Sequence, residues 1–237
     1  MNQSKGKLYL VPCPLGDDAP IKSLPAHTLE IIHALSFFVV EDFKSGRQFI
    51  KKCQHPKAIQ ELQFEHFDKK TDPLLISEIL APLLQGYSMG IVSEAGCPGV
   101  ADPGNALVAF AHRNNIQVVP LIGPNSIIQA LMASGLNGQS FAFHGYLPKN
   151  SQELKQKIYF LEKQSVDFDQ TQIFIETPYR TQGLLDQLLV LAKPQTKLCV
   201  AANLNQQNEV ITSYYIQDWR KAKAKFDKCP AVFLLQA

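Results

Sequence analysis

Short apolar runs alternate with segments of helical periodicity along the first half of the chain. The apolar runs are Lys7–Val11, Phe37–Val40, Met89–Val92 and Gln117–Ile122. Apolar residues spaced as on one face of a helix lie at Leu24–Leu35, Lys57–Gln63, Asp72–Leu84, Asn105–Arg113 and Ser126–Ser134. Strands separated by helices in this order predict an α/β domain with a mostly parallel sheet.

Strand candidates are more closely spaced in the second half. The strand Phe141–Tyr146 precedes an amphipathic helix at Gln152–Leu161, and the strand Gln172–Ile175 precedes a helix at Thr181–Leu191. Further strands follow at Lys197–Ala201, Val210–Ile216 and Ala231–Leu235. This spacing favours antiparallel hairpins in a mixed sheet. We therefore expect two α/β domains, residues 1–134 and 135–237, with a boundary near Gly135.

The segment Ile91–Gly104 connects a predicted buried strand to a helix and reads I-V-S-E-A-G-C-P-G-V-A-D-P-G. Its glycines allow positive φ angles and a close approach of another molecule to the backbone. Its prolines, Pro98 and Pro103, fix φ and stiffen the loop. Loops at the carboxyl ends of strands form the ligand crevice of open α/β sheets. The segment predicts either a structural turn or a loop that holds a small molecule through main-chain groups.

Polar, glycine and proline residues also gather after the other predicted strands. These segments are Pro12–Asp17, Glu41–Asp42, Gly123–Ser126 and Glu176–Arg180. Apolar strands with polar ends are typical of a scaffold that builds a binding cleft. The sequence lacks the G-x-x-x-x-G-K-[ST], G-x-G-x-x-G and G-x-S-x-G motifs of phosphate-binding loops, dinucleotide folds and α/β hydrolases. The six histidines show no ligand spacing, so no metal is expected.

The composition narrows the class of protein further. Hydrophobic residues make up 46% and charged residues 19% of the chain, which is typical of a soluble globular protein. A net charge of +2 argues against a surface that coats nucleic acid, but it allows a local basic patch. The five cysteines lack C-x-x-C spacing, and no secretory signal or apolar run of about 18 residues is visible. We expect a cytoplasmic protein with reduced thiols and no membrane segment.

Several motifs, taken in order along the chain, resemble those of a known family. They are L-Y-L-V-P-C-P-L-G at 8–16, V-V-E-D at 39–42, V-S-E-A-G-C-P-G-V-A-D-P-G at 92–104, V-P-L-I-G-P-N-S at 119–126, A-L-M-A-S-G-L at 130–136, F-A-F-H-G-Y-L-P at 141–148 and I-E-T-P-Y-R at 175–180. The chain resembles the tetrapyrrole-methylase-like (class III) S-adenosylmethionine-dependent methyltransferases. It is most similar to the branch that methylates a ribose 2′-hydroxyl in small-subunit ribosomal RNA.

The resemblance implies two α/β domains with the cofactor cleft between them, S-adenosylmethionine as the methyl donor, and a homodimer. Position by position, it implies donor contacts at Leu15, Gly96, Cys97, Val100, Ser126, Ile127, Glu176, Thr177, Ala201, Pro230 and Ala231. Most of these would be backbone or small-residue contacts, which agrees with the glycine-rich loop. Cys97 would then pack beside the donor and would not be a nucleophile, because no histidine is paired with it locally.

Methyl transfer to a hydroxyl needs a base. The catalytic candidates are Glu41 and Asp42, and Glu41 is favoured because it matches the glutamate in the E-D-T-R motif of the RNA enzymes. Asp42 is equally a candidate for a helix-capping group. Glu94, Tyr179 and Arg180 are predicted to bind the substrate. Arg180 would meet a phosphate or a carboxylate, or it would form a surface ion pair.

The chain departs from the RNA branch on the acceptor side. E-D-F-K (Glu41–Lys44) replaces E-D-T-R, A-N-L-N-Q (Ala202–Gln206) replaces R-E-L-T-K, and Glu94 replaces an aspartate. An ammonium or an amide cannot substitute for a guanidinium in bidentate phosphate recognition. The sequence favours a methyltransferase whose partner is ribosomal RNA or the small ribosomal subunit. It leaves open a tetrapyrrole or other small-molecule acceptor, and a donor-binding protein that has lost acceptor chemistry.

Overall fold

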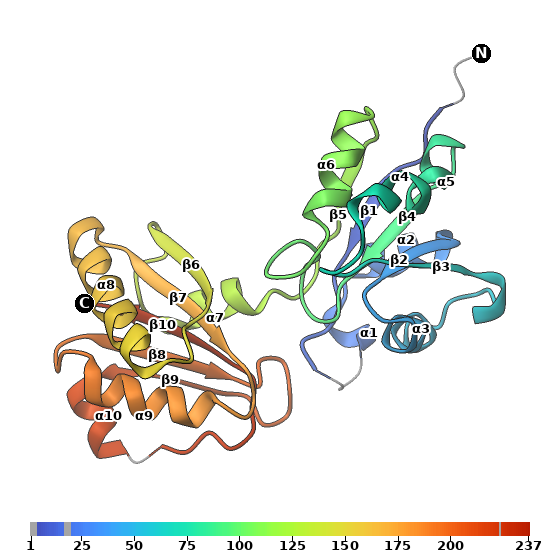
Figure 1. Ribbon diagram of the computed structural model, residues 1–237. Coiled ribbons are helices and arrows are strands. Elements are labelled where there is room, and N and C mark those ends of the chain that lie inside the picture. Colours follow the sequence, from blue (N-terminus) through green and yellow to red (C-terminus); the bar gives the residue numbers. More distant parts are fainter. Residues whose placement is uncertain (1–3, 17–19, 223) are drawn as a thin grey trace. The chain divides into compact units, whose positions relative to one another are not determined.

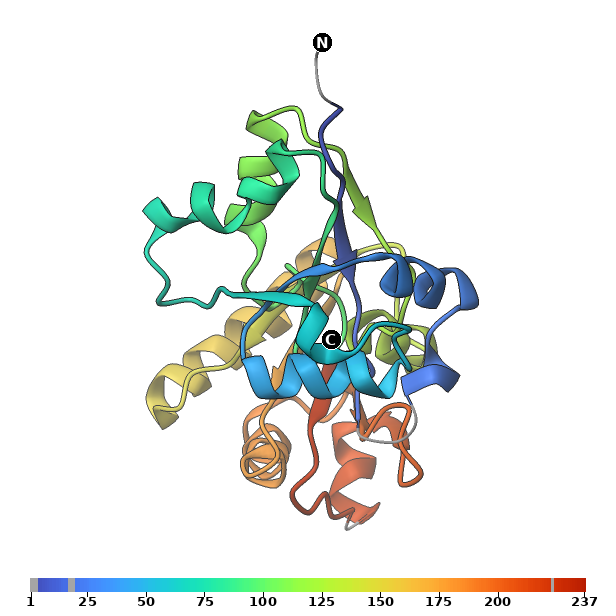
Figure 2. The same cartoon turned by 90° about the vertical axis from the view of Figure 1, so that its right-hand side faces the viewer.

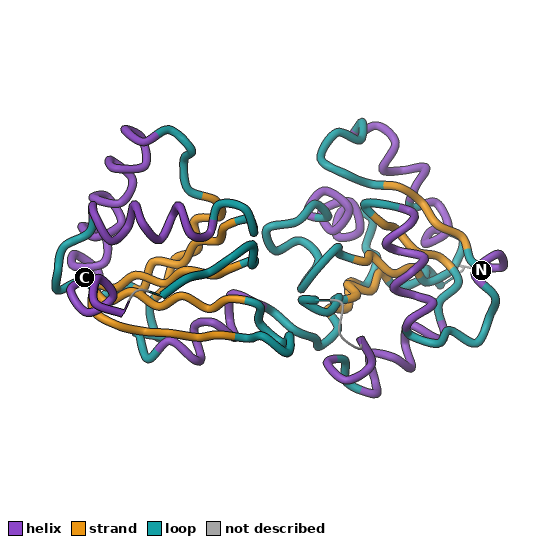
Figure 3. The backbone as a smooth tube through the Cα atoms, turned by 90° about the horizontal axis from the view of Figure 1, so that it is seen from below, coloured by secondary structure: helices purple, strands orange, loops and turns teal. Residues whose placement is uncertain are grey.

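The computed structural model describes residues 4–16, 20–222 and 224–237, so Asp17 of the predicted loop Pro12–Asp17 lies outside the described residues. The chain forms two compact units, Met1–Asn125 and Ser126–Ala237. Each unit contains a five-stranded sheet, and in each the helices flank the strands on both sides (Figures 1 and 3). The predicted class, two α/β domains, is confirmed.

The sheet of the first unit is parallel, as predicted, with the strand order β3-β2-β4-β1-β5. Its strands are β1 (Leu8–Val11), β2 (Phe37–Val40), β3 (Gln63–His66), β4 (Met89–Val92) and β5 (Val118–Pro120). Val11 and Val40 both pair with Val92. The carboxyl ends of the three central strands therefore lie level, and the loops that follow them begin side by side.

Helices cover both faces of this sheet, because alternate strand residues point to opposite sides. On one face, Phe38 and Val40 share an apolar core with residues of α2 (Ala26–Ala34) and α3 (Phe43–Lys52), and α1 (Pro20–Ser23) packs on α3. On the other face, Val39 joins a core with α4 (Ile76–Ile79), α5 (Ala81–Leu84) and α6 (Asn105–Arg113). Helix α3 is seen end-on in Figure 1 and lengthwise in Figure 2.

Two helix predictions in the first unit are corrected. The segment Lys57–Gln63 forms only a 3-10 turn at Ile59–Glu61, and the edge strand β3 follows it. The single helix predicted over Asp72–Leu84 is a 3-10 turn followed by the short helices α4 and α5, because Pro82 lacks the N–H that a continuous helix needs. Asp72 caps the 3-10 turn, since its Oδ1 accepts a hydrogen bond of 2.9 Å from Leu74 N.

The second unit contains a mixed sheet with the order β6-β7-β10-β8-β9. Its strands are β6 (Phe141–Tyr146), β7 (Thr171–Glu176), β8 (Lys197–Ala202), β9 (Val210–Tyr215) and β10 (Ala231–Gln236). Strands β6 and β7 are parallel, whereas β10 is antiparallel to both β7 and β8, and β8 to β9. The mixed sheet is therefore confirmed.

The helices of the second unit also lie on both faces of its sheet. Helices α8 (Ser151–Phe168), α9 (Thr181–Leu191) and α10 (Ile216–Ala222) share one core with Phe174 and Phe233. Helix α7 (Ser126–Ser134) packs against β8, β9 and β10. Because α7 packs on this sheet, the two units divide before it, whereas the sequence-based boundary lies after it.

Candidate functional site

The loops after β1 and β4 leave neighbouring strands towards opposite faces of the first sheet. The chain passes from β1 to the face of α2, and from β4 to the face of α6. Such a switch point is where open α/β sheets form their ligand crevice. The two loops are joined there by a β-bridge, in which Cys13 N donates to Gly96 O at 2.8 Å and Gly96 N donates to Cys13 O at 2.9 Å.

The loop after β4 has the backbone conformation that its glycines predict. Gly96 and Gly104 adopt φ angles of 73° and 131°, which favour glycine. Ala101 lies in the left-handed region at 65°, a strained position for a residue with a Cβ. The buried Ser93 hydroxyl fixes the loop by donating to Gly96 O at 2.7 Å. A Cβ added to Gly99 would meet no atom within 4 Å, so open space lies beside this stretch of backbone.

Three strand-end loops converge beside this backbone. A Cβ on Gly123, after β5, would come within 2.2 Å of Pro12 Cγ, so these two loops lie in close contact. A Cβ on Gly96 would lie 3.5 Å from Leu15 Cδ2. Cys97 Sγ donates to Pro124 O at 3.6 Å. The structure therefore brings together Leu15, Gly96 and Cys97, three of the predicted donor contacts, with Val100 exposed on the same loop.

Glu41 directly follows β2 and is half-buried. Burial, followed by the nearby charges of Asp102 and Glu94, raises the pKa of Glu41 from its ordinary value of 4.5 to about 7. Lys69 acts in the opposite direction. Burial likewise raises the pKa of Asp102, and Glu94 adds to the shift. These carboxylates therefore form an acidic group in which Glu41 holds a proton to unusually high pH.

Asp42 has a different environment. Its Oδ1 accepts hydrogen bonds from Lys44 N at 3.0 Å and Ser45 N at 2.9 Å, so it caps the N-terminus of α3. These bonds, mainly those from Ser45, lower the pKa of Asp42. The capping alternative for Asp42 is thus observed. The Ser45 hydroxyl lies 2.7 Å from Glu94 Oε1, closer than its contacts with Asp42, and so connects α3 to the loop after β4.

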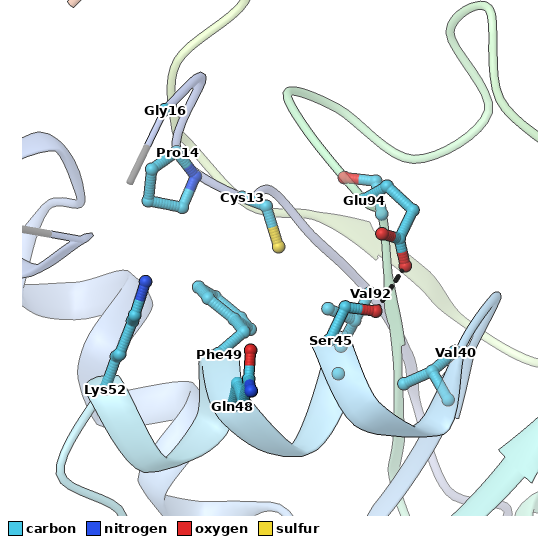
Figure 4. A pocket seen from close by; sticks show the side chains of 12 residues that line it. Cys13, Pro14, Gly16, Val40, Ser45, Gln48, Phe49, Lys52, Val92 and Glu94 are labelled. Carbon is cyan, nitrogen blue, oxygen red and sulfur yellow. Dashed lines mark hydrogen bonds between the residues drawn. The ribbon is translucent and has the colours of Figure 1, made fainter. Parts of the chain in front are cut away.

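A pocket with a volume of about 200 Å³ lies between α3 and the loops after β1 and β4 (Figure 4). Polar side chains from α3 line it together with Glu94; they are Ser45, Gln48 and Lys52. The Cys13 thiol also lines the pocket, and its burial raises the pKa well above the ordinary value, which leaves the thiol unreactive. The sequence did not reveal the α3 residues, because α3 itself was not predicted.

In the second unit, Glu176 ends β7 with its side chain fully buried. Its Oε1 accepts hydrogen bonds from Thr177 N at 2.7 Å and Thr177 Oγ1 at 3.2 Å. Arg180 Nη2 lies 3.1 Å from Glu176 Oε2. This contact is an ion pair outside hydrogen-bonding geometry, since Oε2 accepts no hydrogen bond from the described residues. Arg180 thus has the fully buried carboxylate of Glu176 as its partner, whereas the predicted alternative was a surface ion pair. Tyr179 is 85% exposed.

Strand register gathers the other predicted donor contacts of the second unit. Ala231 pairs with Glu176 on one side and with Ala202 on the other, and Val232 pairs with Ala201. Pro230 directly precedes Ala231. Ser126 and Ile127 are the first residues of α7, which packs on β8 and β10.

The described residues were searched for a metal site and for a membrane-spanning helix. Among residues 4–16, 20–222 and 224–237, no group of three or more His, Cys, Asp or Glu side chains is arranged to hold a metal ion. In the same part of the chain, no helix is both long and apolar enough to cross a membrane. All five cysteines are free thiols.

Solved structures share this architecture. Uroporphyrin-III-C-methyltransferase from Thermus thermophilus matches with a TM-score of 0.53 and 20% identity, covering 98% of this chain and 92% of that one. Diphthine synthase matches with a TM-score of 0.64 and 13% identity, covering 98% and 90%. These likenesses show a common fold, a parallel sheet with a glycine-rich switch-point loop and a mixed second sheet, which is the fold that the resemblance to the tetrapyrrole-methylase-like methyltransferases implies.

Sequence relatives show the family to which the chain belongs. Ribosomal RNA small subunit methyltransferase I of Vibrio cholerae is 31% identical over 86% of this chain and 67% of the relative. The proteins of the same name from Streptococcus pyogenes and Synechocystis are 33% and 30% identical, over 83% and 91% of this chain and 67% and 70% of the relatives. The chain belongs to the ribosomal RNA small subunit methyltransferase I family, and it spans about two thirds of the length of these relatives. No family model matches the chain.

Proposed function

We propose that this methyltransferase transfers a methyl group from S-adenosylmethionine to a ribose 2′-hydroxyl of small-subunit ribosomal RNA. Its relatives carry the name of a ribosomal RNA methyltransferase. The observation that carries the proposal is the environment of Glu41. This half-buried carboxylate lies at the carboxyl end of β2, and its surroundings raise its pKa to about 7. A base for a hydroxyl is most effective when its pKa lies near the working pH.

The residues present fit the donor. The open space beside Gly99 and the positive φ angles of Gly96 and Gly104 suit a ligand held against the backbone. We assign Leu15, Gly96, Cys97 and Val100 in the first unit to the donor, and in the second unit we assign Ser126, Ile127, Glu176, Thr177, Ala201, Pro230 and Ala231. When bound, S-adenosylmethionine supplies a methyl group that is attached to a positively charged sulfur. The remainder of the donor is the leaving group, a neutral thioether.

Glu41 would accept the proton of the acceptor hydroxyl as the new carbon–oxygen bond forms. With a pKa of about 7, about half of the Glu41 side chains are ionised at pH 7. Burial keeps that pKa high, with a further contribution from Asp102 and Glu94, and Asp42 caps the N-terminus of α3. Glu94, Tyr179 and Arg180 stay proposed substrate contacts. The homodimer and the cytoplasmic location stay predictions.

The proposal is tested in two steps. Calorimetry with S-adenosylmethionine is expected to show binding, and undermethylated small ribosomal subunits incubated with labelled donor are expected to gain label in their RNA at a ribose. In Glu41→Gln, donor binding is expected to persist while transfer falls by roughly 10²- to 10⁴-fold, the usual contribution of a positioned base. Glu78→Gln, at an exposed glutamate of α4, serves as the control and is expected to behave like the wild type.

Each outcome separates one part of the proposal from the others. Transfer by Glu41→Gln at the wild-type rate would contradict the role of Glu41 as base. Donor binding without label in any RNA would contradict the RNA acceptor and favour a small-molecule acceptor or lost acceptor chemistry. A chain that binds no donor would contradict the cofactor.

A further inference from the structure

A second cavity, of about 500 Å³, lies along the segment Arg47–Gln60, which comprises the C-terminal half of α3 and the turn that follows it. Its charged lining residues are Arg47, Lys51 and Lys57, and no carboxylate from the described part of the chain lines it. His55 adds no acceptor, because its Nε2 contacts Leu35 O at 3.0 Å and its Nδ1 accepts from Lys57 N at 3.0 Å. We call this cavity the α3 groove.

Arg47 is held in place by aromatic rings. Its guanidinium carbon lies 5.3 Å from the centre of the Phe43 ring and 5.6 Å from that of Phe64. Stacking of this kind orients the planar guanidinium and leaves its N–H groups available for a bidentate contact. Phe43 stands where the RNA branch has threonine, so this chain's own departure from the motif E-D-T-R supplies one of the two rings.

The described residues supply no carboxylate that neutralises the cations of the groove. Among the described residues, no carboxylate lies within ion-pairing distance of Arg47, Lys51 or Lys57, and the Lys57 ammonium donates to Ser36 Oγ at 2.7 Å. Arg47 and Lys51 are four residues apart on α3, where like charges repel each other and weaken a helix. A polyanion in the groove would relieve that repulsion.

The helix that forms the groove also begins at the proposed active site. Asp42 caps α3 directly after Glu41, and Arg47 lies roughly 8 Å further along the helix axis. From the unpaired cations, the stacked guanidinium and this position, we infer that the α3 groove binds the sugar–phosphate backbone of the substrate RNA. Arg47 would bind one phosphate, Lys51 and Lys57 would bind neighbouring phosphates, and the partly exposed ring of Phe43 is available to contact a base. This inference rests on RNA being the acceptor.

The test compares two triple variants that remove the same charge. Arg47→Gln/Lys51→Gln/Lys57→Gln removes the cations of the groove, whereas Lys155→Gln/Lys193→Gln/Lys225→Gln removes three exposed lysines of the second unit. Fluorescence anisotropy measures the affinity for a labelled single-stranded RNA oligonucleotide, and calorimetry with S-adenosylmethionine checks that the site is intact. We expect the groove variant to bind RNA at least about tenfold more weakly, and the control to stay within about twofold of the wild type.

Two results would overturn the inference. One is an equal loss, or no loss, of RNA affinity in the two triple variants. The other is competition by poly-glutamate as effective as that by unlabelled RNA, which would assign the groove to an acidic protein. A third variant, Arg47→Lys, keeps the charge but loses the planar fork, and it is expected to lose affinity too. Because binding is measured directly, the groove is tested even if no RNA becomes methylated.

Discussion

Glu41 and Asp42 are neighbouring carboxylates at the end of β2, and their surroundings move their pKa values in opposite directions. Burial and the charges of Asp102 and Glu94 raise the pKa of Glu41, whereas hydrogen bonds from Ser45 and Lys44 lower that of Asp42. Adjacent acids whose environments separate their protonation in this way take different roles. Glu41 suits proton transfer, and Asp42 suits a permanent cap on α3.

Because the charge of Asp102 raises the pKa of Glu41, removing it is expected to change the pH dependence of methyl transfer. The base must be deprotonated, so activity is expected to rise with pH through the Glu41 pKa of about 7. Asp102→Asn removes a negative neighbour, makes ionisation of Glu41 easier, and is expected to shift this rise to lower pH. The shift is measured as the midpoint of kcat/KM against pH.

Lys69→Gln is the matched control, because it is expected to shift the activity midpoint in the opposite direction. Lys69 lowers the pKa of Glu41, so its removal is expected to shift the rise to higher pH. If neither variant moved the midpoint, the activity profile would report another group, and Glu41 would not be the base. If both shifted it in the same direction, the electrostatic explanation would be wrong.

At the scale of elements, α3 packs unusually close to β2 because residue 46 has no side chain. A Cβ on Gly46 would lie 2.5 Å from Val40 Cγ1 and 3.0 Å from Val40 Cβ. Val40 is buried and β-branched, so it cannot move aside easily. Gly46→Ala is therefore expected to destabilise the protein by about 1–2 kcal/mol, despite the better helix propensity of alanine. Urea unfolding measures the change.

Gly183 in α9 provides the control for that prediction. It is exposed, and a Cβ there would meet no atom within 4 Å, so Gly183→Ala is expected to be neutral or to stabilise by up to about 1 kcal/mol. Val40→Ala added to Gly46→Ala is expected to relieve the clash and recover part of the lost stability. Equal effects of the two single glycine substitutions would contradict the close packing of α3.

The sequence predicted the elements whose apolar residues form continuous or periodic patterns. Strands β2, β4 and β6 and helices α6, α7 and α9 have the predicted bounds. Helix α3 escaped prediction because its contact with the sheet uses Gly46, which reads as a helix breaker although it is buried beside Phe49 and Ile50. The edge strand β3 has no buried residue, so no apolar run marks it.

The candidate site was predictable to the extent that it depends on strand ends. Parallel register places the loops after β1, β2 and β4 together, which the polar clusters in the sequence had indicated. The raised pKa of Glu41 depends first on its burial in the fold and then on Asp102, about sixty positions further along the chain, and no local sequence pattern contains either cause. The α3 side chains of the pocket and the groove were hidden because α3 was not expected.

At the scale of the whole molecule, charge is nearly balanced. Twenty-three basic and twenty-one acidic side chains give a net charge of +2, so general attraction to RNA is weak. Helix α3 differs from this average, since it carries Lys44, Arg47, Lys51 and Lys52 and no acidic residue. The proposed RNA binding therefore depends on a few cations at defined positions and not on the net charge of the molecule.

This distribution of charge predicts a shallow dependence of RNA binding on salt. For a single strand, the slope of log affinity against log salt is about −0.7 for each phosphate neutralised, so three cations in the α3 groove give a slope of about −2. Raising the salt from about 50 to about 200 mM should then weaken binding by roughly 16-fold, far less than for proteins that make six to ten phosphate contacts. Anisotropy titrations at several salt concentrations measure the slope. In the groove triple variant the slope should approach zero, because the remaining affinity would come from stacking; a steep slope that survives in this variant would place the phosphate contacts elsewhere on the chain.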